Sequence, residues 1–387
     1  MQKINLFNNP ILLNYYERDE DLIVETKAAG KSEKRFPVYY MNGVKYIFKP
    51  LSAVKPFSTS LFACAEVFNS YIAKKYFDPN TPLYKLAECR GINGALPKYY
   101  DKGVLVPSYL NYGEKNINLM EYLRSNSTSN DSLESSFEYC VSNFFEEISP
   151  YKYSNHNLVC SSGKMNDYVN YAMSMYNFEP IFDIKIFAEN PKYAKQLAIQ
   201  YLLSLFTRNH NFHYENINFR VCNNEIKGLV PPNDQEYSLM FLYPENNKQN
   251  KKLKEQYLKL FSDNTFIIAT IKKITERYPD IINDFIIGLN QFIIDFTNFT
   301  VPLNSNFIGQ VNSEKWHSGY FRYKEKKESV ANFYDLLYKD NFNVDCNQLM
   351  VRILTDYLES AFLLKNILQK NLEEIHGIAY PLILTNN

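Results

Sequence analysis

Several side chains in this sequence could together bind phosphate oxygens and a divalent metal ion. Lys49 ends an alternating run, and Glu66 follows it on a segment with helical spacing. Much further along, Asn216 and Asp234 offer the oxygen ligands that Mg²⁺ prefers. An amine, a carboxylate that fixes it and metal ligands are the parts that phosphoryl transfer requires, because that reaction depends on positioning and charge neutralisation. The order of these residues along the chain makes the pattern informative.

A turn of small residues precedes the strand that carries the lysine. Residues 28–34 read Ala-Ala-Gly-Lys-Ser-Glu-Lys, and backbone N–H groups in such a turn can approach phosphate oxygens. Gly30, Lys31 and Ser32 are therefore candidates for a phosphate-binding loop. An ordinary polar turn is the alternative interpretation of this segment taken alone.

Lys49 and Glu66 are expected to form an ion pair. Lys45, Ile47 and Lys49 share one face of the strand 44–49, because side chains alternate along a strand. Glu66 lies at the margin of the apolar stripe of the next segment, where a carboxylate is costly to bury without a partner. Lys49 is the expected partner. Solvated lysines and a solvated glutamate at the helix edge are the alternatives.

The strongest pattern lies in the middle of the chain. Asn211-Phe-His213-Tyr-Glu-Asn216 precedes a predicted strand, and Asp234 follows in a Pro-x-x-Asp-x-x-x-Ser-Leu context. These residues resemble the HipA family of serine/threonine kinases and, more distantly, phosphoinositide lipid kinases. The catalytic loop of that family is Asp-x-His-x-x-Asn, and a magnesium-binding Asp follows it. Residues 30–34 are similar to its phosphate loop, Gly-x-Gln-Glu-Lys.

The resemblance covers residues 27–77 and 195–241 and implies a fold and two cofactors. The implied fold is α+β and two-lobed, like that of protein kinases. A small antiparallel-sheet N-lobe is expected over residues 1–115 and a mostly helical C-lobe over residues 116–387, with ATP and Mg²⁺ bound between them.

The resemblance also implies a role for each candidate residue. Lys49 would hold the α/β-phosphates, Glu66 would orient Lys49, and Ile47 would line the adenine pocket. Asn216 and Asp234 would ligate magnesium.

The catalytic loop departs from the family at one position. Asn211 stands where the family has its catalytic aspartate, and an amide cannot accept a hydroxyl proton as a carboxylate does. An engineered inactivating change, a natural loss that leaves a pseudokinase, and a tolerated variant are all open interpretations, as is His210 as a substitute base. His213 would support the loop. Lys27 replaces the serine that HipA-like kinases autophosphorylate, with Ser32 the nearest hydroxyl, so self-inactivation by that route is not expected.

The function that the resemblance implies is ATP-dependent phosphorylation of serine or threonine on a bacterial protein, in a toxin–antitoxin or stress-response setting. The expected partners are a protein substrate and an antitoxin-like protein. The phosphate loop lies close to the start of the sequence, as in short relatives that lack the N-terminal subdomain of full-length HipA. A nucleotide-binding pseudokinase that acts as an interaction module and a lipid kinase are the alternative functions.

The elements that must position these residues can be predicted from periodicity and turn signals. The Asn42-Gly43 pair between two alternating runs predicts a hairpin. Strands are expected at 21–26, 36–40, 44–49, 83–91 and 96–110, with a strand-rich stretch at 215–241. Helices are expected at 61–77, 193–206, 251–261, 264–277, 281–296 and 330–371, and a polar loop at 125–136.

Composition agrees with a cytoplasmic protein. The 387 residues are enough for two lobes around a large core, and 42 basic against 42 acidic residues leave no net charge. We therefore expect no direct contact with nucleic acid or membrane. The six cysteines are scattered, without zinc spacing, and no secretory signal is recognisable. The apolar stretch 281–299 is interrupted by Asn and Asp, which favours a core helix over a membrane span.

Overall fold

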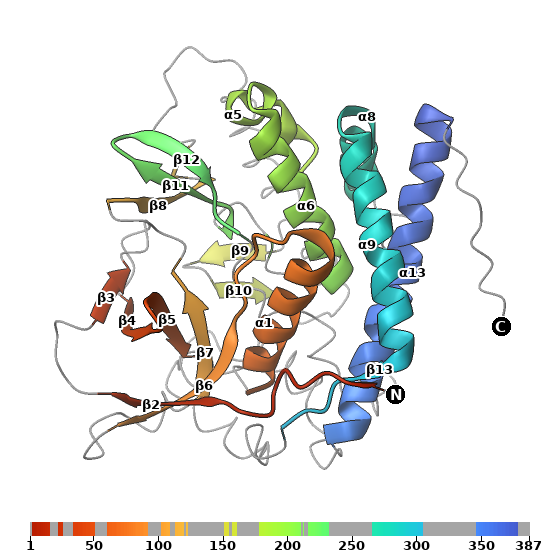
Figure 1. Cartoon of the computed structure of the whole chain (residues 1–387). Helices are drawn as coiled ribbons and strands as arrows, with labels where there is room; N and C mark the ends of the chain where they lie inside the picture. The colour runs from red at the N-terminus through yellow and green to blue at the C-terminus, as the bar shows by residue number, and fades with distance from the viewer. Residues whose placement is uncertain are drawn as a thin grey trace.

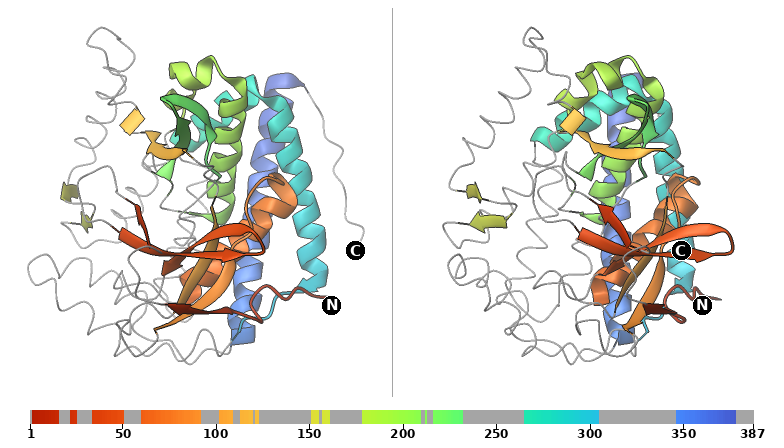
Figure 2. Two further views of the ribbon diagram at one scale, coloured as in Figure 1. Left: turned by 60° about the vertical axis from the view of Figure 1, so that its left-hand side comes forward. Right: turned by 90° about the vertical axis from the view of Figure 1, so that its left-hand side faces the viewer.

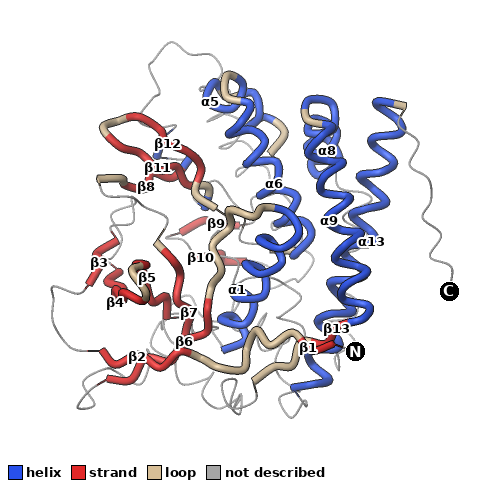
Figure 3. Tube along the Cα trace, in the orientation of Figure 1, coloured by secondary structure: helices blue, strands red, loops and turns tan. Residues whose placement is uncertain are grey.

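The fold is α+β, with a curled sheet in the N-terminal part and helices in the C-terminal part, as predicted (Figure 1). The computed structural model describes residues 2–15, 22–25, 34–50, 60–91, 102–108, 113–119, 121–122, 151–154, 157–160, 178–209, 212, 216–231, 265–304 and 346–377. Figure 3 separates the two parts by colour, with most of the strands on one side and the long helices on the other.

The N-terminal sheet has the order β2-β6-β7-β5-β4-β3 among the described residues. Its strands are β2 (Ile11–Tyr15), β3 (Leu22–Glu25), β4 (Lys34–Met41), β5 (Val44–Pro50), β6 (Lys85–Gly91) and β7 (Lys102–Pro107). The run β3-β4-β5 and the pairs β5–β7 and β6–β7 are antiparallel. The sequence predicted an antiparallel sheet. This is wrong for the edge strand β2, which pairs with β6 in the parallel sense.

The predicted hairpin at Asn42-Gly43 is confirmed. It joins β4 to β5, and both turn residues have positive φ, 51° and 77°. A two-residue turn with two positive φ angles matches the right-handed twist of the strands that it connects. This turn fixes the register of β5 and therefore the face on which Lys49 lies.

The two faces of the sheet pack against different parts of the molecule. Phe48 and Leu105 are paired neighbours on β5 and β7, and both belong to a small apolar cluster on one face. Lys49 is paired with Val104, whose side chain belongs to the large core on the opposite face. Helix α1 (Ser60–Ile72) covers that face, since it packs on β6 and β7.

Helix α1 continues into a π-helical turn, η2 (Ala73–Phe77), so the predicted helix 61–77 is confirmed with a change of winding at its end. In Figures 1 and 2, α1 lies between the sheet and the C-terminal helices. A π-helical turn of this kind is rare.

The C-terminal part is built mainly from long helices. They are α6 (Pro191–Thr207), α8 (Thr265–Arg277), α9 (Pro279–Asn298) and α13 (Cys346–His376), with the short η4 (Pro180–Asp183) and α5 (Lys185–Ala188) before α6. Proline begins α6 and α9, where its missing N–H costs nothing. The predicted helices 193–206, 264–277 and 281–296 are confirmed. The predicted 330–371 corresponds to α13 from Cys346 onward.

Shorter strands complete the fold. The strands β8 (Lys115–Asn118), β11 (Asn218–Cys222) and β12 (Glu225–Leu229) form a sheet of order β12-β11-β8, which confirms part of the strand-rich stretch 215–241. The pair β9 (Tyr151–Ser154) and β10 (Asn157–Cys160) forms a hairpin, and β1 (Gln2–Lys3) lies parallel to β13 (Phe299–Thr300). The predicted helix 251–261 and loop 125–136 lie outside the described residues.

A large apolar core joins α1 to the C-terminal helices. It includes Phe68 of α1, Phe206 of α6, Phe292 of α9 and Tyr357 of α13, all without exposed surface. The helix that follows the Lys49 strand is thus part of both halves of the molecule. None of the described helices is long and apolar enough to cross a membrane.

Candidate functional site

The structure brings Lys49 and Glu66 together, as the sequence predicted. Lys49 Nζ donates to Glu66 Oε1 at 2.5 Å, from the third strand of the antiparallel run to the helix that follows it. The Lys49 side chain keeps 19% of its surface exposed, whereas Glu66 has none. The amine therefore faces outward from a carboxylate fixed behind it.

The depth of Glu66 differs from the prediction. It was expected at the margin of the apolar stripe, but it lies inside the core with Ala65 and Val67 buried on either side. A carboxylate at such a depth requires compensation by a cation or by hydrogen-bond donors. Lys49 supplies that compensation. Ile47 is half-buried on the same face of β5 and is paired with Val106 of β7.

Helix α6 fixes the start of the segment that contains the proposed catalytic loop. Arg208 caps α6 in the left-handed conformation, with φ 51° and ψ 42°, and the N–H of Asn209 donates to Ser204 O at 2.9 Å. Phe212 is buried, and its ring stacks on Phe178 at a centroid distance of 4.9 Å. Phe212 itself is therefore held against the core.

The same helix also fixes the start of the segment that leads to Asp234. Gln200 Nε2 donates to Val230 O at 2.8 Å, just after β12. Asn216 is half-buried immediately before β11, and its carbonyl accepts a hydrogen bond from Asn218 Nδ2 at 3.2 Å. Helix α6 thus holds Asn209, which precedes Asn216, and Val230, which precedes Asp234.

The remaining candidate residues lie outside the described residues: Gly30, Lys31, Ser32, Asn211, His213 and Asp234. The contact between Lys49 and Glu66 is therefore established, whereas its convergence with Asn216 and Asp234 on one site stays a prediction. Ile217 and Phe219, which follow Asn216, belong to the same apolar core as α1.

Two of the described side chains carry groups of the kind that bind a nucleotide with magnesium. A cationic amine held by a carboxylate is a binding group for phosphate oxygens, and an amide oxygen is a hard ligand of the kind that Mg²⁺ takes. Lys49 and Asn216 provide these two groups. Among the described residues, no three His, Cys, Asp or Glu side chains cluster together. Magnesium that is bound through phosphates needs only one or two protein ligands.

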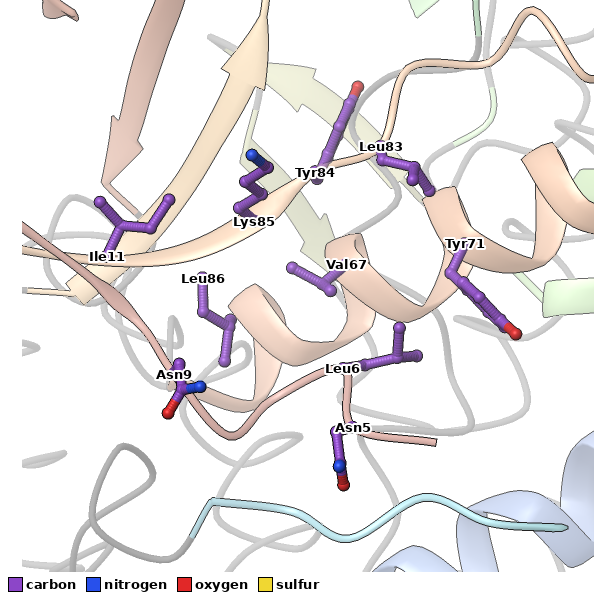
Figure 4. A pocket seen from close by; sticks show the side chains of 10 residues that line it. All are labelled: Asn5, Leu6, Asn9, Ile11, Val67, Tyr71, Leu83, Tyr84, Lys85 and Leu86. Carbon is purple, nitrogen blue, oxygen red and sulfur yellow. The ribbon is translucent and has the colours of Figure 1, made fainter. Parts of the chain in front are cut away.

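A cavity of about 240 Å³ lies on another flank of α1 (Figure 4). Val67 and Tyr71 of α1 face it together with Leu6 and Leu86. These two α1 residues lie about 100–140° around the helix axis from Glu66, at 3.6 residues per turn. The cavity is therefore separate from the Lys49–Glu66 pair and is not the candidate nucleotide site.

Two buried polar residues of the site region were not predicted from the sequence. Gln200 and Asn69 have 5% and 1% of their surface exposed, and each takes part in a hydrogen bond to another segment. The available signal was an amide at a core-facing position of an otherwise apolar helix. Such a residue usually has a specific partner.

Comparisons with known proteins add little to this geometry. No protein-family model and no curated protein matches the sequence. A solved structure described as the crystal structure of a Helicobacter pylori proinflammatory kinase, CtkA, is 12% identical to this chain, and the match covers 79% of this chain and 93% of that chain with a TM-score of 0.33. A TM-score this low supports no conclusion about fold or activity, so both are argued from contacts within the chain.

Proposed function

We propose that this protein is an ATP-dependent kinase of the HipA-like type that phosphorylates serine or threonine of a protein substrate. The observation that supports this proposal is the ion pair of Lys49 with Glu66. In protein kinases a lysine on the third strand of the sheet pairs with a glutamate on the next helix, and both must be in place for phosphoryl transfer. This chain has a lysine strand followed by a glutamate helix in the same sequence order, with the same contact between the two side chains.

In this proposal, residues of the N-terminal part bind the nucleotide. Lys49 binds phosphate oxygens, and Glu66 keeps the amine pointed at them. Gly30, Lys31 and Ser32 cover the phosphates through backbone N–H groups, and Ile47 contacts the base. ATP supplies the phosphoryl group that is transferred.

The catalytic loop would complete the site. Asn216 and Asp234 present the oxygen ligands for Mg²⁺, and His213 supports the loop. Asn211 occupies the position from which a carboxylate would orient the substrate hydroxyl and accept its proton. An amide there can position the hydroxyl but does not accept the proton.

Calorimetry with ATP and Mg²⁺ tests the proposal directly. We expect magnesium-dependent binding that Lys49→Met abolishes and Lys45→Met retains, because Lys45 lies on the same strand and face but is half-buried away from the pair. Lys49→Arg keeps a cation for Glu66 and serves as the second variant, with circular dichroism confirming that each variant is folded. Equal affinity of the Lys49 and Lys45 variants, or no binding by the unmodified protein, would overturn the proposal.

Asn211 favours a second candidate function, a nucleotide-binding pseudokinase that acts as an interaction module. The two functions predict the same ATP binding but different phosphotransfer. If the base has been lost, Asn211→Asp should raise the rate by about 10²-fold or more, the usual contribution of general base catalysis. If Asn211 suffices, the two proteins should transfer phosphate at similar rates.

The substrate and partner belong to the proposal as well. We infer a bacterial protein substrate, an antitoxin-like regulator and a cytoplasmic setting, with no direct contact with nucleic acid or membrane. Phosphoproteomic comparison of cells expressing the protein with cells expressing Lys49→Met tests the substrate class. Phosphorylated lipid in place of phosphoserine or phosphothreonine would favour the lipid kinase alternative instead.

A further inference from the structure

Helix α1 carries Glu66, but the C-terminal helices determine where α1 lies. Near Glu66, the ring of Phe68 packs edge-on against Phe296 of α9 at 5.7 Å and against Tyr357 of α13 at 5.0 Å. One helical turn after Glu66, the hydroxyl of Tyr357 donates to Asn69 Oδ1. Asn69, Phe68 and Tyr357 are all buried. This part of α1 is therefore enclosed by residues from the far end of the sequence.

The end of α1 is fixed by α9 in the same way. Phe77 of the π-helical turn η2 stacks on Phe285 of α9 at 4.2 Å. Gly288 permits this approach, because a Cβ at that position would lie 2.5 Å from Tyr76 O and 2.7 Å from the Phe77 ring. Asp295 accepts hydrogen bonds from Lys75 and Tyr76 about two turns further along α9. These contacts leave α1 little freedom to shift along or turn about its axis.

The position of Glu66 follows from these contacts because a helix moves as a rigid element. Residues three apart lie on neighbouring parts of a helix surface, so Asn69 and Glu66 must turn together. A rotation that broke the hydrogen bond from Tyr357 to Asn69 would carry the Glu66 carboxylate away from Lys49. An oriented hydroxyl thus adds a directional constraint to the apolar packing, which by itself tolerates small rotations.

We propose that Tyr357 is a positioning residue, which acts through Asn69 to hold Glu66 against Lys49. The effect of Tyr357 on ATP binding rests on the proposed function, whereas its effect on the Lys49–Glu66 contact does not. The C-terminal helix α13 would then set the geometry of the lysine, and a ligand or partner that displaced α13 would weaken phosphate binding without touching the site.

Ser360 provides a matched control on the same helix. Its hydroxyl is buried one turn from Tyr357, but it donates to Phe206 O of α6 at 2.9 Å and has no part in holding α1. Tyr357→Phe and Ser360→Ala each remove one buried hydroxyl from α13. A purely structural role predicts similar consequences for both variants, whereas a positioning role predicts a difference at Lys49.

The experiment measures the acylation rate of the Lys49 amine by mass spectrometry, together with ATP affinity in the presence of Mg²⁺. Glu66→Gln gives the rate for an amine without its carboxylate partner. We expect Tyr357→Phe to raise the acylation rate toward that of Glu66→Gln. We also expect this variant to weaken ATP binding by about fivefold, the change in affinity that the loss of one hydrogen bond usually causes. Ser360→Ala should leave both unchanged.

An unchanged acylation rate in Tyr357→Phe, or the same increase in Ser360→Ala, would overturn the inference. Failure of the unmodified protein to bind ATP would instead overturn the proposed function, because acylation of Lys49 does not depend on a nucleotide. The two failures are therefore distinguishable in one set of proteins.

Discussion

At the scale of single residues, the Lys49–Glu66 pair differs from an ion pair of the same length on the surface. Lys227 and Glu225 are also 2.5 Å apart, but 41% and 74% of their side-chain surfaces are exposed, against 19% and 0% for Lys49 and Glu66. Water can solvate Glu225 when its partner is removed. Glu66 has no such access, so the loss of Lys49 leaves a carboxylate buried in the core.

Lys49→Met should therefore destabilise the protein strongly. We expect the free energy of unfolding to fall by about 3 kcal/mol, the range observed when one partner of a buried ion pair is removed. Urea denaturation followed by circular dichroism measures the change. Lys227→Met is the control and should leave the denaturation midpoint where it is. A midpoint shift of equal size in both variants would show that the burial of Glu66 is not the cause of the destabilisation.

The sequence predicted the partners of this pair but not their depth. Alternation along β5 and helical spacing in α1 are local, so the faces of Lys49 and Glu66 follow from nearby residues. Burial of Glu66 depends also on α9 and α13, which lie far away in the sequence, and no local pattern reports them. The roles of Asn211 and Asp234 remain predictions from resemblance.

At the scale of elements, the contact between η2 and α9 depends on the missing side chain of Gly288. Glycine in the middle of a helix normally costs about 1 kcal/mol relative to alanine. At this position the backbone of Tyr76 and the ring of Phe77 occupy the space that a Cβ would need. Glycine at position 288 therefore lowers the helix propensity of α9 but allows η2 to pack closely against it.

Replacement of a glycine inside a helix by alanine usually stabilises a protein, but Gly288→Ala should destabilise this one. Steric overlap should lower the free energy of unfolding by about 1–3 kcal/mol, as in overpacked cores. Thermal denaturation of the variant measures this effect. The neighbouring Ile287 is 57% exposed, and Ile287→Ala is expected to change stability by no more than about 0.5 kcal/mol. An increase in melting temperature for Gly288→Ala would refute the close packing.

Asp295 links the same two elements electrostatically. Burial raises the pKa of Asp295, but hydrogen bonds from Lys75, Tyr76 and Gln291 outweigh this effect and hold the pKa below its ordinary value of 3.8. Burial, together with the hydrogen bond to Asp295, raises the pKa of the Tyr76 hydroxyl. A carboxyl with a lowered folded-state pKa stabilises the fold above its ordinary pKa, and this contribution is lost as pH falls through the lowered value.

Asp295→Asn should thus cost more stability at neutral than at acidic pH. We expect a clear loss at about pH 7 that shrinks as the pH falls below 3.8 and through the lowered pKa of Asp295, where the unmodified carboxylate also becomes protonated. Chemical denaturation at several pH values gives the comparison. Asp280→Asn on the same helix removes an exposed ion pair with Lys195 and serves as the control. A loss of equal size at all pH values would exclude the carboxylate charge as the cause.

Element prediction was accurate where the signal was local and incomplete where pairing was distant. The hairpin at Asn42-Gly43 and the helices α8 and α9 followed from turn chemistry and periodicity. The parallel pairing of β2 with β6 and the addition of β8 to β11 were not predicted. Such pairings join segments far apart in the chain, and short strands have little periodicity of their own.

At the scale of the whole molecule, the continuous core predicts that α1 unfolds together with the C-terminal helices. Hydrogen exchange should therefore give similar opening free energies for amides of α1, α9 and α13. Amides of β3 and β4 should exchange faster, since these strands form the far edge of the sheet from the large core. Faster exchange of α1 than of α9 and α13 would show that α1 belongs to a separate folding unit.

The burial of α1 by α9 and α13 also has a consequence for synthesis on the ribosome. Phe68 and Phe77 leave the exit tunnel roughly 200 residues before α9 and roughly 290 residues before the contacting part of α13. The delays are about 10–40 s and about 15–60 s at about 5–20 residues per second. During that interval the nascent chain exposes an apolar helix surface of the kind that chaperones bind. Ribosome-bound chains that end before α9 should be captured by ribosome-associated chaperones, and chains that extend beyond α13 should be released.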